Sequence, residues 1–197
     1  VENSTHTPNK YAVGFEIQNT RPATNVFAVS TSDDSYENAD SNTKPNYDDN
    51  SKTYSLVTNQ EFVKIELPEY DASKTDAQID PYYLVVTDSL GKYIYNYQHK
   101  NLGGEILPDF VGDKRTILLP TGIVRDANGE IDLVNSTKDI EYTIKVRFKI
   151  SNGDDAVDYY KDCYKYYEAY TENKKTLYRV VYYYEAIYKV KIDREPP

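Results

Sequence analysis

The chain has 197 residues, a formal net charge of −9, and 22 tyrosines with no tryptophan or methionine. This charge disfavours a general nucleic-acid-binding protein, which needs a basic surface to neutralise phosphates. No apolar run approaches about eighteen residues, so we expect no membrane span. The length suits a single domain over residues 1–197 with its own core, and the absence of a leader fits a mature secreted chain.

The N-terminal region combines a polar tail with a short predicted strand. Residues 1–9 are polar and contain Pro8, which is typical of a frayed terminus. Residues 10–17 then alternate in polarity, so one face of a strand would be apolar. The apolar side chains are those of Tyr11, Val13, Phe15 and Ile17. A second strand is predicted at 25–30, after a turn at 20–22.

Residues 31–53 form the most acidic stretch and contain few apolar side chains, so composition predicts a long flexible loop. Its carboxylates, together with neighbouring Asn and Ser oxygens, are the hard ligands that calcium prefers. These carboxylates belong to Asp33, Asp34, Glu37, Asp40, Asp48 and Asp49. The strict calcium-loop pattern is absent, so a solvated acidic loop stays the alternative. A weaker cluster comprises Asp154, Asp155 and Asp158.

Short strands separated by turns are predicted through the middle of the chain. They cover residues 54–57, 61–67, 82–87, 93–97, 116–119 and 131–134. The continuous apolar run at 82–87 predicts a strand buried on both faces. The polar connection at 69–80 could contain one helical turn near 73–78. Turns are expected at 88–91 and 126–129.

Three consecutive strands are predicted in the last third of the chain. Residues 141–151 alternate strictly and end at Asn152-Gly153, a strong hairpin signal. The chain returns over 157–170, turns at 172–174 and continues over 176–192. A helix over 156–170 stays open as an alternative. The last strand would bury one parity, comprising Tyr178, Val180, Tyr182, Tyr184, Ala186, Tyr188, Val190 and Ile192.

The strand pattern indicates an all-β fold: a single antiparallel β-sandwich or jelly-roll-like domain with a C-terminal three-strand Tyr-rich meander. Several tyrosines, including Tyr159, Tyr166 and Tyr183, fall on the parity opposite the main apolar face. Exposed rings can stack on sugars or bind another protein. The alternative is that both faces of these strands are core.

Two sequons could carry glycans in a secreted chain, at Asn3 and Asn135. The single Cys163 cannot form an internal disulfide, and we expect it to be a small apolar residue on a strand or, less simply, an intermolecular bridge. None of the common catalytic motifs occurs, so we do not expect an enzyme. No cofactor is implied beyond the calcium hypothesis.

The leading functional hypothesis is a structural subunit of an extracellular filament or cell-surface assembly. Residues 1–18 would act as a donor strand that completes the sheet of the next copy. The side chains that pack into that copy would be those of Tyr11, Val13, Phe15 and Ile17. The partners would then be copies of the chain itself. The alternative is a secreted carbohydrate-binding or adhesive module for surface glycans, with or without calcium. A viral capsid jelly roll is allowed by the fold class, although no basic arm supports it.

Overall fold

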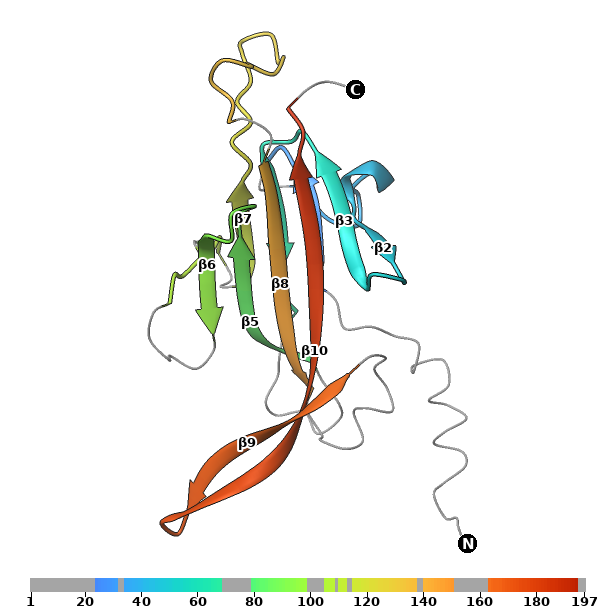
Figure 1. Cartoon of the computed structure of the whole chain (residues 1–197). Helices are drawn as coiled ribbons and strands as arrows, with labels where there is room; N and C mark the ends of the chain where they lie inside the picture. The colour runs from blue at the N-terminus through green and yellow to red at the C-terminus, as the bar shows by residue number, and fades with distance from the viewer. Residues whose placement is uncertain are drawn as a thin grey trace, which may run out of the picture. The chain divides into compact units, whose positions relative to one another are not determined.

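The computed structural model describes residues 24–31, 34–68, 79–98, 105–108, 110–112, 115–137, 140–150 and 163–194 (Figure 1). The strands are β1 (Asn25–Val29), β2 (Asn46–Asp48), β3 (Thr53–Thr58), β4 (Phe62–Glu66), β5 (Ile79–Thr87), β6 (Tyr93–Gln98), β7 (Thr116–Pro120), β8 (Ile140–Ile150), β9 (Tyr164–Glu172) and β10 (Lys175–Ile192). A single 3-10 turn, η1 (Ser41–Thr43), is the one helical element in these ranges. The expectation of an all-β chain is confirmed for the described residues.

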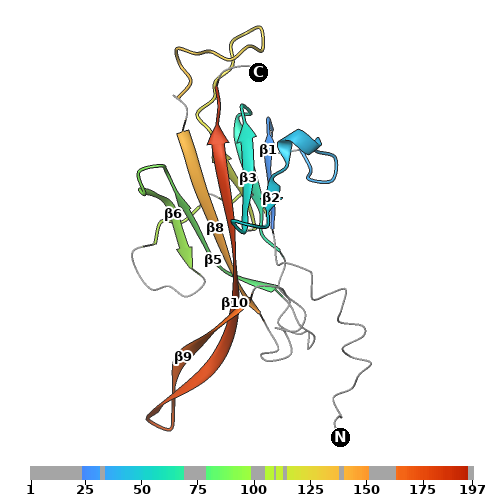
Figure 2. The same ribbon diagram turned by 45° about the vertical axis from the view of Figure 1, so that its right-hand side comes forward.

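The strands form two sheets. The smaller has the order β1-β4-β7, and the larger has the order β2-β3-β10-β8-β5-β6, with β9 paired to β10 (Figures 1 and 2). The larger sheet is mixed, because β3 and β10 pair in parallel. The prediction of a purely antiparallel arrangement is therefore wrong at this pair. Parallel neighbours need a long crossover, and here the whole chain from β4 to β9 connects them.

Contacts between residues divide the chain into two compact units, and β5, β8 and β10 each continue from one into the other. We call the first the hairpin unit; its described residues are 79–80, 147–150 and 163–185. The main unit contains the other described residues. The division falls within three strands, and the single-domain hypothesis stays a prediction.

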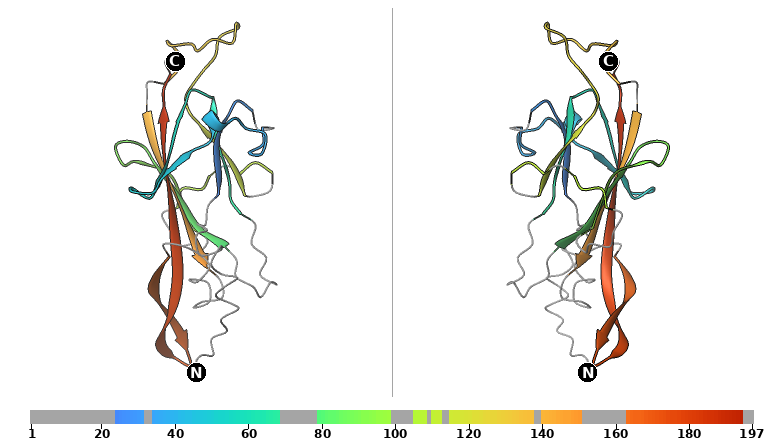
Figure 3. Two further views of the ribbon diagram at one scale, coloured as in Figure 1. Left: turned by 90° about the vertical axis from the view of Figure 1, so that its right-hand side faces the viewer. Right: turned by 90° about the vertical axis from the view of Figure 1, so that its left-hand side faces the viewer.

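The core of the main unit lies on the inner face of the smaller sheet. Val26 pairs with Ile65, which pairs with Ile117, so their side chains share one face and all three are fully buried. In the larger sheet, Tyr188 stacks on Tyr54 with ring centroids 4.6 Å apart. The Tyr188 hydroxyl also hydrogen-bonds the backbone beside β1. The smaller sheet thus lies against the larger one within this unit (Figure 3).

The acidic stretch at 31–53 contains more structure than its composition predicts. It includes η1 and β2, and β2 pairs with β3. The Tyr36 ring packs edge-on against Phe27 at 5.3 Å, and the Lys64 ammonium donates to the Asp34 carbonyl oxygen at 2.9 Å. One aromatic ring and one buried lysine thus anchor an otherwise polar segment. Outside η1, β2 and the start of β3 its described residues are turns, bends or irregular, and the interpretation as a long acidic loop stays a prediction.

Most predicted strands are confirmed, namely those at 25–30, 54–57, 61–67, 93–97, 116–119 and 141–151. On β8 the predicted parity is buried throughout: Tyr142, Ile144, Val146, Phe148 and Ile150. The predictions for 10–17, 73–78 and 152–153 fall outside the described residues. The strand interpretation of 157–170 is confirmed from residue 164 onward, where the helix alternative is wrong.

Two middle segments differ from prediction. Residues 131–134 form a single bridge from Ile131 to Arg125, followed by a turn in which Val134 is 91% exposed. The Asp132 carboxylate accepts hydrogen bonds from the amides at 134 and 135 and so stabilises that turn. On β5, Leu84 and Val86 are buried while Val85 is half-buried, so only one face is core.

The C-terminal strand buries different parities along its length. From Tyr184 to Ile192 the predicted parity is buried, but Val181 and Tyr183 of the opposite parity are buried as well. Residues 175–180 are exposed on both faces. Along the chain, β10 pairs with both β8 and β9. The predicted buried parity therefore holds only from Tyr184 onward.

Candidate functional site

The β9–β10 hairpin turns over Asn173 and Lys174, which have φ of 51° and 64°. Positive φ at both central residues is the geometry of a type I′ turn, which matches the right-handed twist of paired strands. The register that follows pairs Glu172 with Lys175 and continues to Tyr164 and Tyr183. Figure 1 shows the resulting two-stranded ribbon. The predicted turn at 172–174 is thereby confirmed.

One face of this hairpin, which we call the charged face, is built around Glu168. Its carboxylate lies 3.4 Å from Arg179 Nε and 3.9 Å from Lys149 Nζ. The Arg179 guanidinium also lies 4.4 Å from the ring centroid of Tyr170. Farther along, Arg147 pairs with Glu185 at 3.2 Å. The charged side chains named here thus already have partners within the hairpin unit.

The opposite face, which we call the tyrosine face, comprises the side chains of Lys165, Tyr167, Ala169, Thr171, Thr176, Tyr178, Val180 and Tyr182. Tyr167 pairs with Val180, and Ala169 pairs with Tyr178, so these four side chains adjoin one another on one surface. Tyr167 is 61% exposed and Tyr178 is 69% exposed. Large aromatic side chains gathered and exposed in this way are typical of interaction surfaces.

The structure places the predicted exposed tyrosines differently from one another. Tyr166 is 55% exposed, as predicted, whereas Tyr183 is only 4% exposed. The Tyr183 ring is covered by the Arg147 guanidinium at 5.8 Å and by the Tyr166 ring at 5.7 Å. The burial of Tyr183 therefore agrees with the alternative expectation that both faces of these strands are core. Tyr159 lies outside the described residues.

Sequence reasoning missed the tyrosine face because it considered each strand by itself. Alternation along the last strand predicts that Tyr178 and Val180 are buried, yet both are exposed. The signal that could have found this face is the two-residue turn. Once the turn fixes the register, Tyr167 and Tyr178 fall on the same face of the hairpin.

The proposed calcium ligands are not brought together in the described residues, where no group of three acidic, His or Cys side chains could hold a metal ion. The Asp34 carboxylate instead accepts the Ser30 amide at 3.2 Å. Asp48 accepts the Asn50 amide at 2.9 Å, and this hydrogen bond lowers the pKa of Asp48. Asp40 accepts from Thr43 through its carbonyl oxygen. Asp49 follows β2 and is exposed, while Asp33, Asp154, Asp155 and Asp158 lie outside the described residues. The calcium hypothesis stays a prediction.

Two shallow polar hollows adjoin one another in the main unit, next to the turn between β3 and β4. Gln60 and Thr43 line both of them. The first has a volume of about 240 Å³, and its other walls come from Asn42, Val57, Thr58, Asn59 and Asp193. Amide and hydroxyl groups of this kind can hydrogen-bond a polar ligand, but no aromatic side chain lines either hollow.

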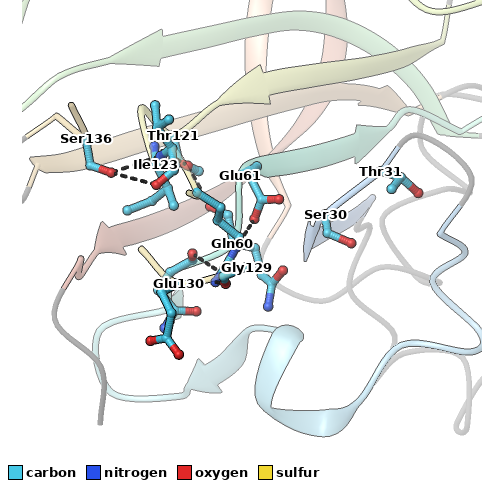
Figure 4. Close-up of polar contacts among 12 residues, drawn as sticks. Ser30, Thr31, Gln60, Glu61, Thr121, Ile123, Gly129, Glu130 and Ser136 are labelled. Carbon is cyan, nitrogen blue, oxygen red and sulfur yellow. Dashed lines mark hydrogen bonds and ion pairs between the residues drawn. The ribbon is translucent and has the colours of Figure 1, made fainter. Parts of the chain in front are cut away.

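The turn beside these hollows is fixed by the 121–137 loop (Figure 4). The Thr121 hydroxyl donates to the Gln60 carbonyl oxygen at 2.6 Å. Arg125 donates to Glu61 at 2.9 Å and to the carbonyl oxygens of Asn59 and Gly129 at 3.1 Å each. With its guanidinium held by three acceptors, this arginine acts as a structural clamp.

The sequon at Asn135 lies at the end of the same loop. The Asn135 side chain is exposed, and its amide nitrogen donates to Asp132 Oδ2 at 2.7 Å. Ser136 is buried, and its hydroxyl accepts the Val124 amide at 2.9 Å. The loop therefore gives Asn135 and Ser136 structural roles that do not require a glycan. Asn3 lies outside the described residues, and glycosylation of either asparagine stays a prediction.

Cys163 precedes β9 and is half-buried. Among the described residues there is no helix long and apolar enough to cross a membrane. Comparison of the chain with protein-family models, with curated proteins and with solved structures found no match.

Proposed function

We propose that the chain is a structural subunit of an extracellular filament or cell-surface assembly, built on a β-sandwich. Copies would polymerise by β-strand donation from the segment that contains Tyr11, Val13, Phe15 and Ile17. The observation that carries the proposal is the tyrosine face. Its exposed rings of Tyr167 and Tyr178 offer the kind of surface that protein interfaces bury at their centres.

Stability considerations also support a partner for this hairpin. An isolated two-stranded ribbon is marginally stable in water, and packing against a further layer is the usual remedy. Both strands of the hairpin are largely exposed between residues 165 and 180. A contact that covers the tyrosine face would supply that layer and remove large apolar surface from water.

The charge of the chain sets the conditions for assembly. Copies with a net charge of −9 repel one another. At 0.1 M ionic strength, salt largely screens this repulsion between charges more than about 10 Å apart. We therefore expect assembly at 0.15 M salt rather than at very low salt. Negative-stain electron microscopy and analytical ultracentrifugation of the native chain would detect filaments or their short precursors.

The double variant Tyr167→Ser/Tyr178→Ser tests the surface. We expect it to raise the concentration needed for assembly at least tenfold, since buried interface tyrosines are frequent hot spots. The matched control is Leu90→Ser, because Leu90 is 92% exposed on a turn of the main unit. The proposal fails if the native chain stays monomeric at every salt concentration, or if both variants assemble like the native chain.

A carbohydrate-binding or adhesive module is the second candidate function. The adjoining polar hollows at Gln60 favour it, because their amide and hydroxyl groups suit a hydroxyl-rich ligand. This alternative predicts monomers that bind glycans, whereas the structural proposal predicts assembly without glycans. A glycan array combined with size-exclusion chromatography distinguishes the two.

A further inference from the structure

The outer edge of β9 has backbone groups that point away from β10. Since the turn at 173–174 has two residues, the closing pair Glu172–Lys175 is hydrogen-bonded and the pairs alternate from there. Every second residue of β9 therefore directs its amide and carbonyl groups outward; these residues are Lys165, Tyr167, Ala169 and Thr171. Within the described ranges, β9 is paired with β10 alone. Such an edge can accept a further strand.

The residues with outward backbone groups also contribute side chains to the tyrosine face. A strand added to this edge would lie directly beside Tyr167 and Ala169. If its own side chains on that face were apolar, they would extend the exposed aromatic cluster and cover part of it. Its other side chains would lie beside the charged face, where small or charged residues fit next to Glu168 and Arg179.

We propose that the strand accepted by β9 is the 10–17 segment of a second copy, paired antiparallel. This inference rests on the proposed function and names the acceptor for the donated strand. The eight residues of the segment match the nine of β9. Its apolar parity suits the tyrosine face, and its other parity consists of Lys10, Ala12, Gly14 and Glu16.

Charge and side-chain size select one register. Placing Lys10 opposite Glu172 brings opposite charges together, and it also places Phe15 opposite Tyr167. The same register puts Val13 opposite Ala169 and Gly14 opposite Glu168. Because glycine has no side chain, the Glu168–Arg179 ion pair keeps its space.

Crosslinking between two differently tagged chains tests this register. One chain has Val13→Cys and the other has Ala169→Cys, each with Cys163→Ser so that no native thiol reacts. A short bis-maleimide is added, and the joined peptides are identified by mass spectrometry. The matched control replaces Val13→Cys by Ala12→Cys, which lies on the opposite parity. We expect at least tenfold more crosslinking from position 13 than from position 12.

A backbone variant provides an independent measurement. Ala169→Pro removes one outward amide from the edge of β9 while leaving the hydrogen-bonded pairs with β10 in place. We expect it to raise the assembly concentration at least tenfold, whereas Ala169→Ser keeps the amide and should assemble like the native chain. Circular dichroism of both variants checks that they fold.

The outcomes separate this inference from the proposed function. If the native chain assembles but position 13 does not crosslink to position 169 of another chain, the acceptor is wrong and the structural role stands. Crosslinks between two copies of position 169 would likewise overturn the inference. A native chain that never assembles would overturn both.

Discussion

The hydroxyl of Tyr188 on β10 exchanges two hydrogen bonds with the backbone of Thr24, the residue before β1. It donates to the Thr24 carbonyl oxygen at 3.1 Å and accepts from the Thr24 amide at 3.2 Å. Tyr188 is 1% exposed, and both bonds are buried. One phenol group therefore joins the two sheets of the main unit and satisfies both backbone groups at the start of β1.

Tyr188→Phe should therefore destabilise the chain by about 1–3 kcal/mol, because it leaves a buried amide and a buried carbonyl without this partner. The stacking of the ring on Tyr54 would be kept. Urea unfolding measures the loss. The control is Tyr178→Phe, since the Tyr178 side chain is exposed and its hydroxyl can be replaced by water contacts. Equal stability of the two variants would contradict the structural role of the Tyr188 hydroxyl.

Gly122→Ala should destabilise the chain more than Gly129→Ala. Both glycines have positive φ, +84° and +81°, so an alanine at either position is strained by roughly 1–2 kcal/mol. At Gly122 the added methyl group would also overlap the Thr137 side chain, whereas at Gly129 it would meet open space. Thermal unfolding compares the two variants. Adding Thr137→Gly should recover part of the lost stability in the Gly122→Ala variant but not in the Gly129→Ala variant. If Gly122→Ala and Gly129→Ala destabilise the chain equally, the close approach of Gly122 to Thr137 is contradicted.

Asp132 should contribute to stability at neutral pH and lose this contribution in acid. The Asn135 side chain is the largest cause that lowers the pKa of Asp132 below its ordinary value of 3.8, and backbone amides add to it. When the pKa of a carboxyl is lower in the folded state than in the unfolded state, its contribution to stability is complete at pH values above the unfolded-state pKa. The contribution disappears as the pH falls through the folded-state pKa. The stability difference between the native chain and Asp132→Ala should thus be constant above about pH 5 and shrink below 3.8.

Asn135→Ala provides the control for this pH dependence, because it removes the hydrogen bond that has the largest effect on the Asp132 carboxylate. We expect most of the acid-dependent difference to disappear in that background. Urea unfolding of unglycosylated protein between pH 2.5 and 7 would be measured for all variants. A difference that grows as the pH falls would have the wrong sign for a stabilising carboxylate.

Local sequence patterns predicted the strands well where one face is buried by a neighbouring sheet. On β8, the strict alternation from Tyr142 to Ile150 matched burial residue by residue. Alternation predicted a strand wrongly where a side chain hydrogen-bonds nearby backbone amides. Asp132 turns a stretch that looked like a strand into a loop, because its carboxylate competes for the amides of residues 134 and 135.

The candidate site was only partly predictable. The excess of tyrosine and the turn at 172–174 both come from the sequence. The clustering of Tyr167 with Tyr178 does not, because it depends on the register across the turn. For the acidic residues, the sequence suggested a cluster that the described residues do not show. Their residue types suggested a shared site, whereas Asp34 and Asp48 each accept hydrogen bonds from nearby amides.

The amino-acid sequence by itself determined most of the segments that extend, the apolar face of β8 and the place where the last hairpin turns, since these depend on side-chain period and local backbone preference. Only the tertiary structure decided that β3 lies parallel to β10, that Tyr183 is buried and that Tyr178 is exposed. The physical reason is that the exposure of a ring depends on which strand or side chain covers that part of the sheet, and such neighbours come from distant parts of the chain.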